Sequence, residues 1–196
     1  MDDETEAAVM AATSRALCEH GYADLTMQRI ADEWDKSKAA LHYHYDTKEE
    51  LLESFLDWTI ARFDSRLACE AADPRERLDT FVEALFGPAE ESDGSFAIAL
   101  LAMKAQAPHS ETYRDRLAEV DARMRETLAE TIRDGIEAGQ FREVDPEDTA
   151  RFAATAINGS HVRRVALDER PAEARRLFEQ YLDATLGREQ APEVPV

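Results

Sequence analysis

The 196-residue chain has few of the features that mark membrane, secreted or metal-dependent proteins. No segment approaches the roughly 18 uninterrupted apolar residues of a membrane span, and the acidic start, MDDETEAAVMAATSRAL, lacks the apolar core of a signal peptide. The two cysteines, Cys18 and Cys69, lie in helix-like sequence without the spacing of metal ligands, so we expect buried free thiols in a cytoplasmic protein. The sequence has no glycine-rich phosphate loop and no nucleophile motif, and its five histidines are scattered, so we expect no enzyme, no metal and no cofactor.

Lysine is scarce as well, and the few lysines are clustered. Aspartate and glutamate number 42 against 23 lysines and arginines, which gives a net charge of −19, and only four of the 23 bases are lysines. This balance predicts a halophilic protein from a high-salt cytoplasm, where ions screen self-repulsion, although an ordinary acidic protein is the alternative. Lys36, Lys38 and Lys48 lie close together in the sequence, which indicates a local function for them.

With only seven glycines and no Val/Ile/Thr-rich run bounded by turn pairs, the sequence predicts an all-α fold of about nine helices. Thr26, Ser37, Thr47 and Asp145 are expected helix caps, and Gly21 is expected to end the first helix. A polar loop is expected at 87–94 and a disordered tail at 188–196. The expected helices cover residues 4–20, 27–34, 37–45, 47–70, 96–106, 110–138, 145–169 and 171–187, with one more that begins at Pro74.

The stretch SKAALHYHY, residues 37–45, has two interpretations. As a strand it places His42 and His44 on one face, as a metal site requires; as a helix it places them about 200° apart, where they cannot share an ion. Ser-Lys-Ala-Ala is good helix-start sequence, and the stretch follows a capped helix and a three-residue turn, so a helix-turn-helix is favoured. Leu41 and Tyr45 then point inward.

The outward face of that short helix suits the major groove of DNA. Alanine at two positions lets the backbone approach closely, the aromatic and histidine side chains can reach bases or phosphates, and the flanking lysines suit the sugar-phosphate backbone. Thr26 and Ser37 serve equally well as caps alone. The candidate DNA-binding residues are Thr26, Lys36, Ser37, Lys38, Ala39, Ala40, His42, Tyr43, His44 and Lys48.

The segment HGYADLTMQRIADEWDKSKAALHYHYDTKEELL resembles the DNA-binding domain of the TetR family of transcriptional regulators. The positions that agree with the family pattern are Gly21, Tyr22, Thr26, Ile30, Ala31, Ser37, Leu41, Lys48, Glu49 and Leu51. The departures are Asp35 where the family has glycine, Lys36 where it has valine, Ala39 and Ala40 in place of glycine and threonine, and His42 in place of tyrosine. Asp35 can still adopt the left-handed conformation at modest cost. Further along, GIEAGQFREVDPEDTARFAATAINGSHVRR is similar to ligand domains of the choline-responsive repressors.

The resemblance implies a helix-turn-helix DNA-binding domain at 1–47 and a ligand-binding and dimerisation domain at 48–187. It implies a repressor that binds a palindromic operator as a homodimer and is released by a small molecule. The apolar helix faces after residue 50 serve as core by default, and in the family they also enclose a pocket for an effector, here hydrophobic or weakly polar. The candidate ligand-binding residues are Trp58, Phe63, Phe81, Phe96, Met103, Tyr113, Met124, Phe152, Asn158 and His161.

The last two helices carry the candidate dimer interface. Small side chains on the first of them let another helix approach closely, and the final helix has a matching stripe. A dimer also suits DNA reading, because two-fold symmetry matches a palindromic operator. A monomer with these helices folded inward is the alternative. The candidate interface residues are Ala153, Ala156, Ile157, Ser160, Leu177, Tyr181, Ala184 and Thr185.

The charge of the first 50 residues conflicts with DNA binding. They contain 12 acids and five bases, a net charge of −7. Non-specific DNA affinity rests on lysine and arginine, so we expect weak or inverted salt dependence in a binder of this kind. A helix-turn-helix protein that has lost DNA binding and acts through protein contacts is the alternative function. The sequence leaves open the effector, the operator, and whether binding represses or activates transcription.

Overall fold

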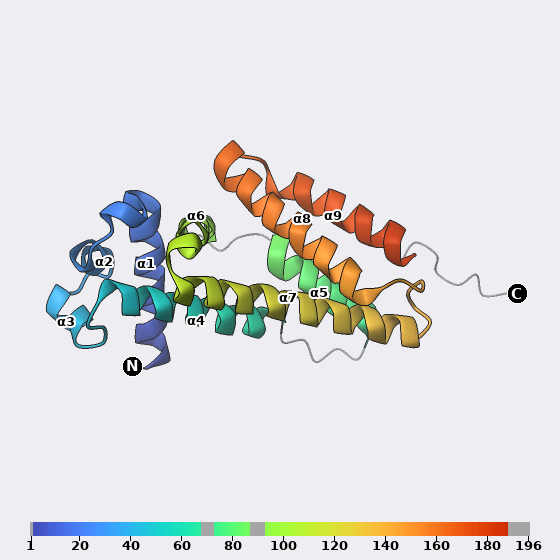
Figure 1. Cartoon of the computed structure of the whole chain (residues 1–196), viewed down its shortest axis with the longest axis horizontal. Helices are drawn as coiled ribbons and strands as arrows, with labels where there is room; N and C mark the ends of the chain where they lie inside the picture. Colours follow the sequence, from blue (N-terminus) through green and yellow to red (C-terminus); the bar gives the residue numbers. More distant parts are fainter. Residues whose placement is uncertain (1, 68–72, 87–92, 188–196) are drawn as a thin grey trace, which may run out of the picture. The chain divides into compact units, whose positions relative to one another are not determined.

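A computed structural model of the protein describes residues 2–67, 73–86 and 93–187, and every regular element in these ranges is helical. The described α-helices are α1 (Asp3–Asp24), α2 (Met27–Glu33), α3 (Lys38–His42), α4 (Lys48–Leu67), α5 (Pro74–Phe86), α6 (Asp93–Gln106), α7 (Glu111–Glu137), α8 (Pro146–Leu167) and α9 (Pro171–Leu186), with a short 3-10 helix, η1, at Ala107–His109 (Figure 1). The all-α prediction is confirmed. Contacts divide the chain into unit 1 (Met1–Arg62 and Ala89–Val120) and unit 2 (Phe63–Pro88 and Asp121–Val196).

Short-range capping chemistry determines where several helices begin. The side chains of Thr26, Ser37, Thr47 and Asp145 each accept a hydrogen bond from the backbone N–H three residues later, at 2.8 to 3.2 Å. Each bond satisfies a backbone donor that the first helical turn leaves without a partner. The predicted capping roles of these residues are therefore confirmed.

Several element boundaries differ from the sequence prediction. The backbone leaves the helical conformation at Gly21 (φ 69°, ψ 170°) as expected, but α1 continues beyond this break to Asp24. Helix α3 ends at His42 instead of residue 45, and α6 begins at Asp93, inside the predicted loop at 87–94. Several predictions fall outside the described residues. They concern Cys69, the end of the fourth helix at residue 70, most of the loop at 87–94, and the tail at 188–196.

Unit 1 is built around the N-terminal helices and α6, which packs along α1. Its core is closed by large side chains with no exposed surface, including Met10, Ile30, Leu41, Leu51 and Phe55. Leu41 ties the short α3 to this core, and Tyr45 is only 6% exposed, so both residues point inward as predicted. The helix-turn-helix is thus held by a packed core and is not left as an isolated pair of short helices.

Cys18 is exposed, which corrects the expectation of a buried thiol. Its neighbours Ala16 and Leu17 face the core, and successive helical residues are rotated by about 100°. Cys18 therefore falls on the outer side of α1.

Unit 2 contains α5, α8, α9 and the C-terminal part of α7. Its core is apolar and includes Leu78, Phe81, Ile132, Phe178 and Leu182. Helix α9 packs against both α5 and α8. Within the described part of the chain, no helix is long and apolar enough to cross a membrane.

Candidate nucleic-acid interface

The turn between α2 and α3 is a helix C-terminal motif built on an aspartate. Asp35 has φ 56°, and the backbone N–H of Lys36 donates to the carbonyl of Ala31 at 3.3 Å. The N–H of Asp35 donates to the carbonyl of Asp32 at 3.4 Å, which completes the pattern of a Schellman motif. Asp35 therefore adopts the left-handed conformation expected of it, and the chain reaches Ser37 ready to start α3.

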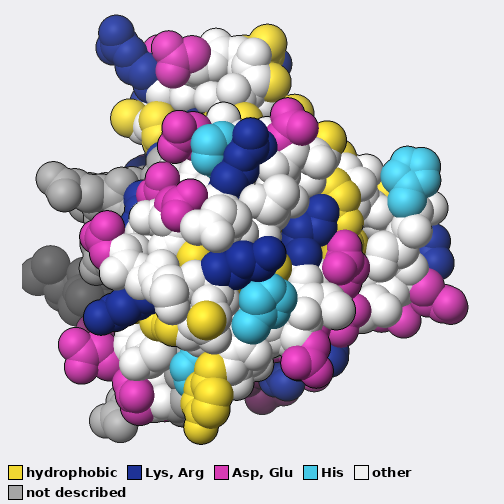
Figure 2. All heavy atoms as spheres, turned by 90° about the vertical axis from the view of Figure 1, so that its left-hand side faces the viewer, with side chains coloured by type: hydrophobic (Ala, Val, Ile, Leu, Met, Phe, Trp, Pro, Cys, Tyr) yellow, Lys and Arg dark blue, Asp and Glu magenta, His cyan; other side chains and the backbone are white. Residues whose placement is uncertain are grey.

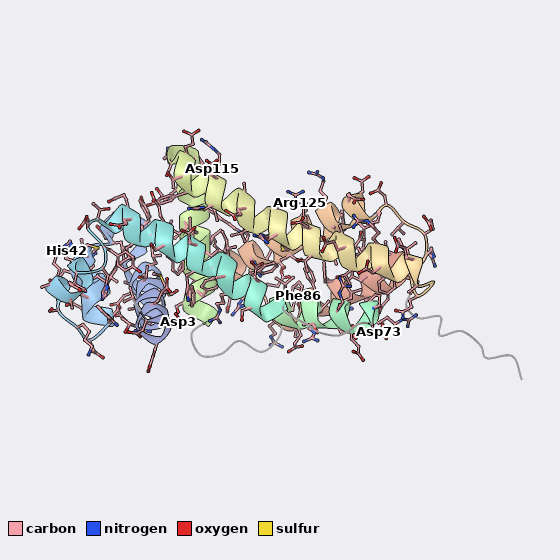
Figure 3. The ribbon with its side chains drawn as sticks, turned by 90° about the horizontal axis from the view of Figure 1, so that it is seen from below. Asp3, His42, Asp73, Phe86, Asp115 and Arg125 are labelled. Atoms are coloured by element: carbon pink, nitrogen blue, oxygen red, sulfur yellow. The ribbon has the colours of Figure 1, made fainter. Side chains whose placement is uncertain are left out.

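The tip of α3 presents an aromatic and a histidine side chain outward. Tyr43 is 85% exposed, and His42 and Ala39 are exposed as well. The Nδ1 of His42 donates to the carbonyl oxygen of Tyr45 at 3.2 Å, which leaves Nε2 for an outside partner. Figure 3 places His42 at the outer end of unit 1, away from Asp115 on α7. A short helix exposed in this way can enter a major groove.

Two of the predicted contact residues are less accessible than their neighbours. Ala40 is half-buried, and so is His44, whose ring lies edge-on to the rings of Trp34 and Tyr43 at centroid distances of 6.5 and 5.0 Å. His44 therefore supports the orientation of Tyr43 and of the α2 C-terminus. The sequence analysis listed both His42 and His44 as candidate DNA contacts, and the packing of His44 against Trp34 distinguishes them.

The basic side chains of the first 50 residues fall into two groups. Arg15 is paired with Glu33, with its Nε 2.9 Å from the carboxylate, and Arg29 donates to the carbonyl of Asp24. Lys36, Lys38 and Lys48, in contrast, form no ion pair with any residue that the structure describes. Their charges stay available to an anion. Figure 2 looks onto the side on which α2 and α3 lie in Figure 1, and Lys, Arg and His side chains appear there among Asp and Glu.

The predicted ligand-binding residues are divided between the two units. Met103, Tyr113, Phe81 and Met124 are buried in the cores, as the default interpretation of these helix faces expected. Phe152 is 55% exposed, so it does not line an internal cavity of its unit. Trp58, Phe96, Met103 and Tyr113 belong to unit 1, and Phe63, Phe81, Met124, Phe152, Asn158 and His161 belong to unit 2.

Two aromatic residues of unit 1 already hold a cation. The Arg62 guanidinium lies 5.4 Å from the ring centroid of Trp58 and 5.9 Å from that of Phe96. The two rings meet edge to face at 6.2 Å, and Phe55 packs against both of them. This arrangement is one that binds organic cations in proteins.

The predicted dimer interface also needs a correction. Ala153 and Ile157 are at most 1% exposed and belong to the core of unit 2, so they do not present a surface to another chain. The exposed apolar side chains of α8 and α9 are Phe152, Val162, Leu167 and Leu177. The sequence prediction included Leu177 but assigned Phe152 to the pocket. Ala184 is exposed, and Ala156, Ser160, Tyr181 and Thr185 are half-buried.

Helix α2 is capped, a Schellman turn follows it, and the lysines around the short exposed α3 form no ion pair with the described residues. These features define a helix-turn-helix DNA-binding regulator. Residues 9–55 match the bacterial regulatory proteins of the tetR family, and residues 74–187 match the C-terminal domain of BetI-type transcriptional repressors. The chain therefore belongs to the TetR family of transcriptional regulators.

Curated relatives agree with this assignment over almost the whole chain. The transcriptional regulator BetI of Agrobacterium fabrum is 30% identical over 188 residues, which cover 91% of this chain and 86% of that protein. The transcriptional repressor KstR2 of Mycobacterium tuberculosis is 28% identical over 176 residues, which cover 86% of this chain and 84% of that protein.

Solved structures share the fold. A TetR transcription regulator from Haloarcula marismortui is 43% identical, with a TM-score of 0.84 over 94% of this chain and 100% of that chain. A transcriptional regulator from Saccharomonospora viridis, solved in complex with choline, is 23% identical with a TM-score of 0.81 over 94% of this chain and 98% of that chain. At this lower identity the likeness concerns the fold alone.

Proposed function

We propose that the protein is a ligand-responsive repressor that binds a palindromic operator as a dimer through α2 and α3 and leaves it when a small molecule binds. The observation that carries the proposal is the exposed end of α3, where Tyr43 and His42 project beside lysines that no described carboxylate neutralises. BetI-type and KstR2 repressors among the matches favour repression over activation.

In this proposal the side chains of the interface have distinct roles. Tyr43, His42 and Ala39 reach base edges, because they are exposed on the helix that enters the groove. The exposed lysines Lys36 and Lys38 contact phosphates, and so does Lys48 at the start of α4. The remaining candidates, Thr26, Ser37, Ala40 and His44, contribute backbone N–H groups, close approach and support.

The dimer is proposed to form through α8 and α9. Phe152 and Leu177 are each more than half exposed, and the ring of Phe152 packs on that of Tyr181 at 4.8 Å, so the two helices share an apolar outer surface. Large apolar side chains left in water favour burial against a partner. A second copy of the chain suits this surface because a two-fold dimer matches a palindromic operator.

The effector is proposed to be a small molecule of low polarity or a compact organic cation. Choline is the first compound to test, because residues 74–187 match BetI-type repressors and the regulator from Saccharomonospora viridis was solved with choline. The Trp58 and Phe96 rings support a cationic ligand, since they already accommodate the Arg62 guanidinium.

Adaptation to high salt is part of the proposal. The net charge of −19 and the 43% identical regulator from the halophile Haloarcula marismortui both support it. Because counterion release contributes little at high salt, direct contacts from α3 must supply most of the affinity.

The test is the binding of the purified protein to its own upstream DNA, followed by fluorescence anisotropy from about 0.2 to about 3 M KCl. We expect saturable binding that random DNA competes poorly, that persists at high salt and that choline or another effector reduces. The variant Tyr43→Ala/Lys48→Ala should lose binding with only a small decrease in melting temperature, because Tyr43 is exposed and Lys48 makes no ion pair within the described residues.

The net charge of −7 over the first 50 residues favours a second candidate function, a helix-turn-helix protein that acts through protein contacts. Folded, dimeric protein that binds no DNA at any KCl concentration would favour this candidate. A steep loss of operator affinity between about 0.5 and about 2 M KCl would instead contradict the salt adaptation alone.

A further inference from the structure

Lys48, the first residue of α4, lies on an aromatic ring and not beside a carboxylate. Its ammonium is 4.8 Å from the ring centroid of Tyr22, which follows the break of α1 at Gly21. Tyr22 is half-buried and packs against the core of unit 1, so its ring is a fixed platform for a flexible side chain. Lysine has substantial rotamer freedom, and a contact of this kind restricts it.

The choice of partner matters because carboxylates are plentiful around Lys48. Glu49 and Glu50 follow it directly, yet Lys48 forms no ion pair within the described residues. Glu50 is engaged elsewhere, since its carboxylate accepts from the backbone N–H of Asp46 at 2.8 Å. A ring attracts an ammonium without neutralising it, whereas a carboxylate would have to be displaced before the lysine bound a phosphate.

A second tyrosine packs against the ring of Tyr22. The ring of Tyr113 meets it edge to face, with centroids 6.4 Å apart and planes at 82°. Tyr113 is 2% exposed, and its hydroxyl is buried without a hydrogen-bond partner in the described structure. Burial, followed by the neighbouring Tyr22 hydroxyl, raises the pKa of Tyr113 well above its ordinary value. Tyr113 thus remains a neutral packing group.

The position of Tyr113 connects this arrangement to the rest of the chain. It lies in the first turn of α7, whose residues up to Val120 belong to unit 1 and whose later residues belong to unit 2. Helix α7 therefore contains both Tyr113, which packs against Tyr22, and residues of unit 2.

We propose that Tyr22 is a positioning residue for DNA binding. Its ring holds the Lys48 ammonium in position for a backbone phosphate, and Tyr113 keeps the ring in place. A shift of the first turn of α7 away from Tyr22 then lowers operator affinity through Lys48. This inference rests on the proposed DNA-binding function and adds a residue and a route of regulation to it.

The test is a double-mutant cycle on operator affinity, with the wild type, Tyr22→Leu, Lys48→Ala and the double variant measured by anisotropy at one KCl concentration. Tyr22→Leu should weaken binding about two- to five-fold, the range of one cation–π contact at a partly exposed site. In the Lys48→Ala background the same change should have no effect. Tyr22→Phe is the matched control, because it keeps the ring, and it should bind like the wild type.

Tyr113→Leu extends the cycle to the second ring. It should weaken binding in the wild type and leave Lys48→Ala unchanged, whereas Tyr113→Phe should bind normally. Additive effects of Tyr22→Leu and Lys48→Ala in a protein that binds its operator would overturn the positioning role alone. Failure of the wild type to bind any DNA would instead overturn the proposed function.

A spectroscopic measurement tests the ring contact without DNA. The chain has only four lysines, so 13C-methylation of the lysine amines gives few NMR signals to assign. The signal of Lys48 should be displaced by the ring current of Tyr22, and the displacement should persist in Tyr22→Phe. A Lys48 signal at the position of the exposed lysines in the folded wild type would overturn the inference even if Tyr22→Leu does not fold.

Discussion

At the scale of single residues, two buried tyrosines of unit 1 make the stability of the protein depend on pH. Burial, and secondarily Glu6, raises the pKa of Tyr45 to about 12, while a hydrogen bond with Ser54 acts in the opposite direction. Burial also raises the pKa of Tyr113, with smaller effects of Tyr22 and of the carboxylates Glu49 and Glu53. Both phenols therefore lose their protons less readily in the folded state than in the unfolded state.

The sign of the pH dependence follows from these pKa values. A raised folded pKa contributes stability that is complete below the unfolded pKa of about 10 and is lost as pH rises above it. We predict that the free energy of unfolding, measured with urea, is level from about pH 8 to about pH 9.5 and falls beyond pH 10. Tyr45→Phe and Tyr113→Phe should each make that fall less steep. An unchanged slope in both variants would contradict the assignment.

The same two substitutions should differ near neutral pH. Tyr45→Phe removes a hydrogen bond with Ser54 and should lower the free energy of unfolding by about 1 kcal/mol. The Tyr113 hydroxyl has the Tyr22 hydroxyl as a neighbour but makes no hydrogen bond of good geometry in the described structure, so Tyr113→Phe should change the free energy of unfolding by less than Tyr45→Phe does. Each variant is the control for the other, because both delete one hydroxyl from a buried tyrosine.

At the scale of secondary-structure elements, the turn of the helix-turn-helix is strained at one residue. Asp35 has φ 56°, a conformation that costs an L-residue about 1–2 kcal/mol relative to the right-handed region and costs glycine almost nothing. Aspartate reduces this cost compared with most residues, because its short polar side chain can bond locally.

We predict that Asp35→Gly raises the free energy of unfolding by about 0.5–1 kcal/mol, even though glycine makes the unfolded chain more flexible. Asp35→Ala is the matched comparison and should lower it, since alanine has neither the freedom of glycine nor a local hydrogen bond. Urea unfolding of the three proteins measures both differences. A destabilised Asp35→Gly would show that the aspartate side chain contributes more than the backbone strain removes.

At the scale of the whole molecule, the outer surface of α8 and α9 determines the proposed assembly. Leu177 is 56% exposed on α9, and a charge placed there would be buried without a partner in a dimer. We predict that the wild type is a dimer by light scattering and that Leu177→Asp is a folded monomer. Ala7→Asp, on an exposed position of α1, adds the same charge and should remain dimeric. A monomeric wild type, or a dimeric Leu177→Asp, would contradict the proposed interface.

Short-range signals in the sequence predicted much of the fold. Thr26, Ser37, Thr47 and Asp145 mark helix starts because a cap needs only a side chain and a backbone N–H three residues away. The left-handed turn at Asp35 and the inward direction of Leu41 are local in the same sense, and both agree with the structure. The helix-turn-helix could therefore be located from about 30 residues of sequence.

Which side of a helix is covered was decided only by the tertiary structure. Ala153 and Ile157 belong to the core of unit 2 while Phe152 is exposed, and the small side chains had suggested the reverse. The contact of Lys48 with Tyr22, and that of Tyr22 with Tyr113, join residues 26 and 91 positions apart. Capping bonds form within one helical turn, so the sequence by itself determined where these helices begin. Burial depends on which distant helix packs against each face, so only the tertiary structure determined which helix faces are exposed.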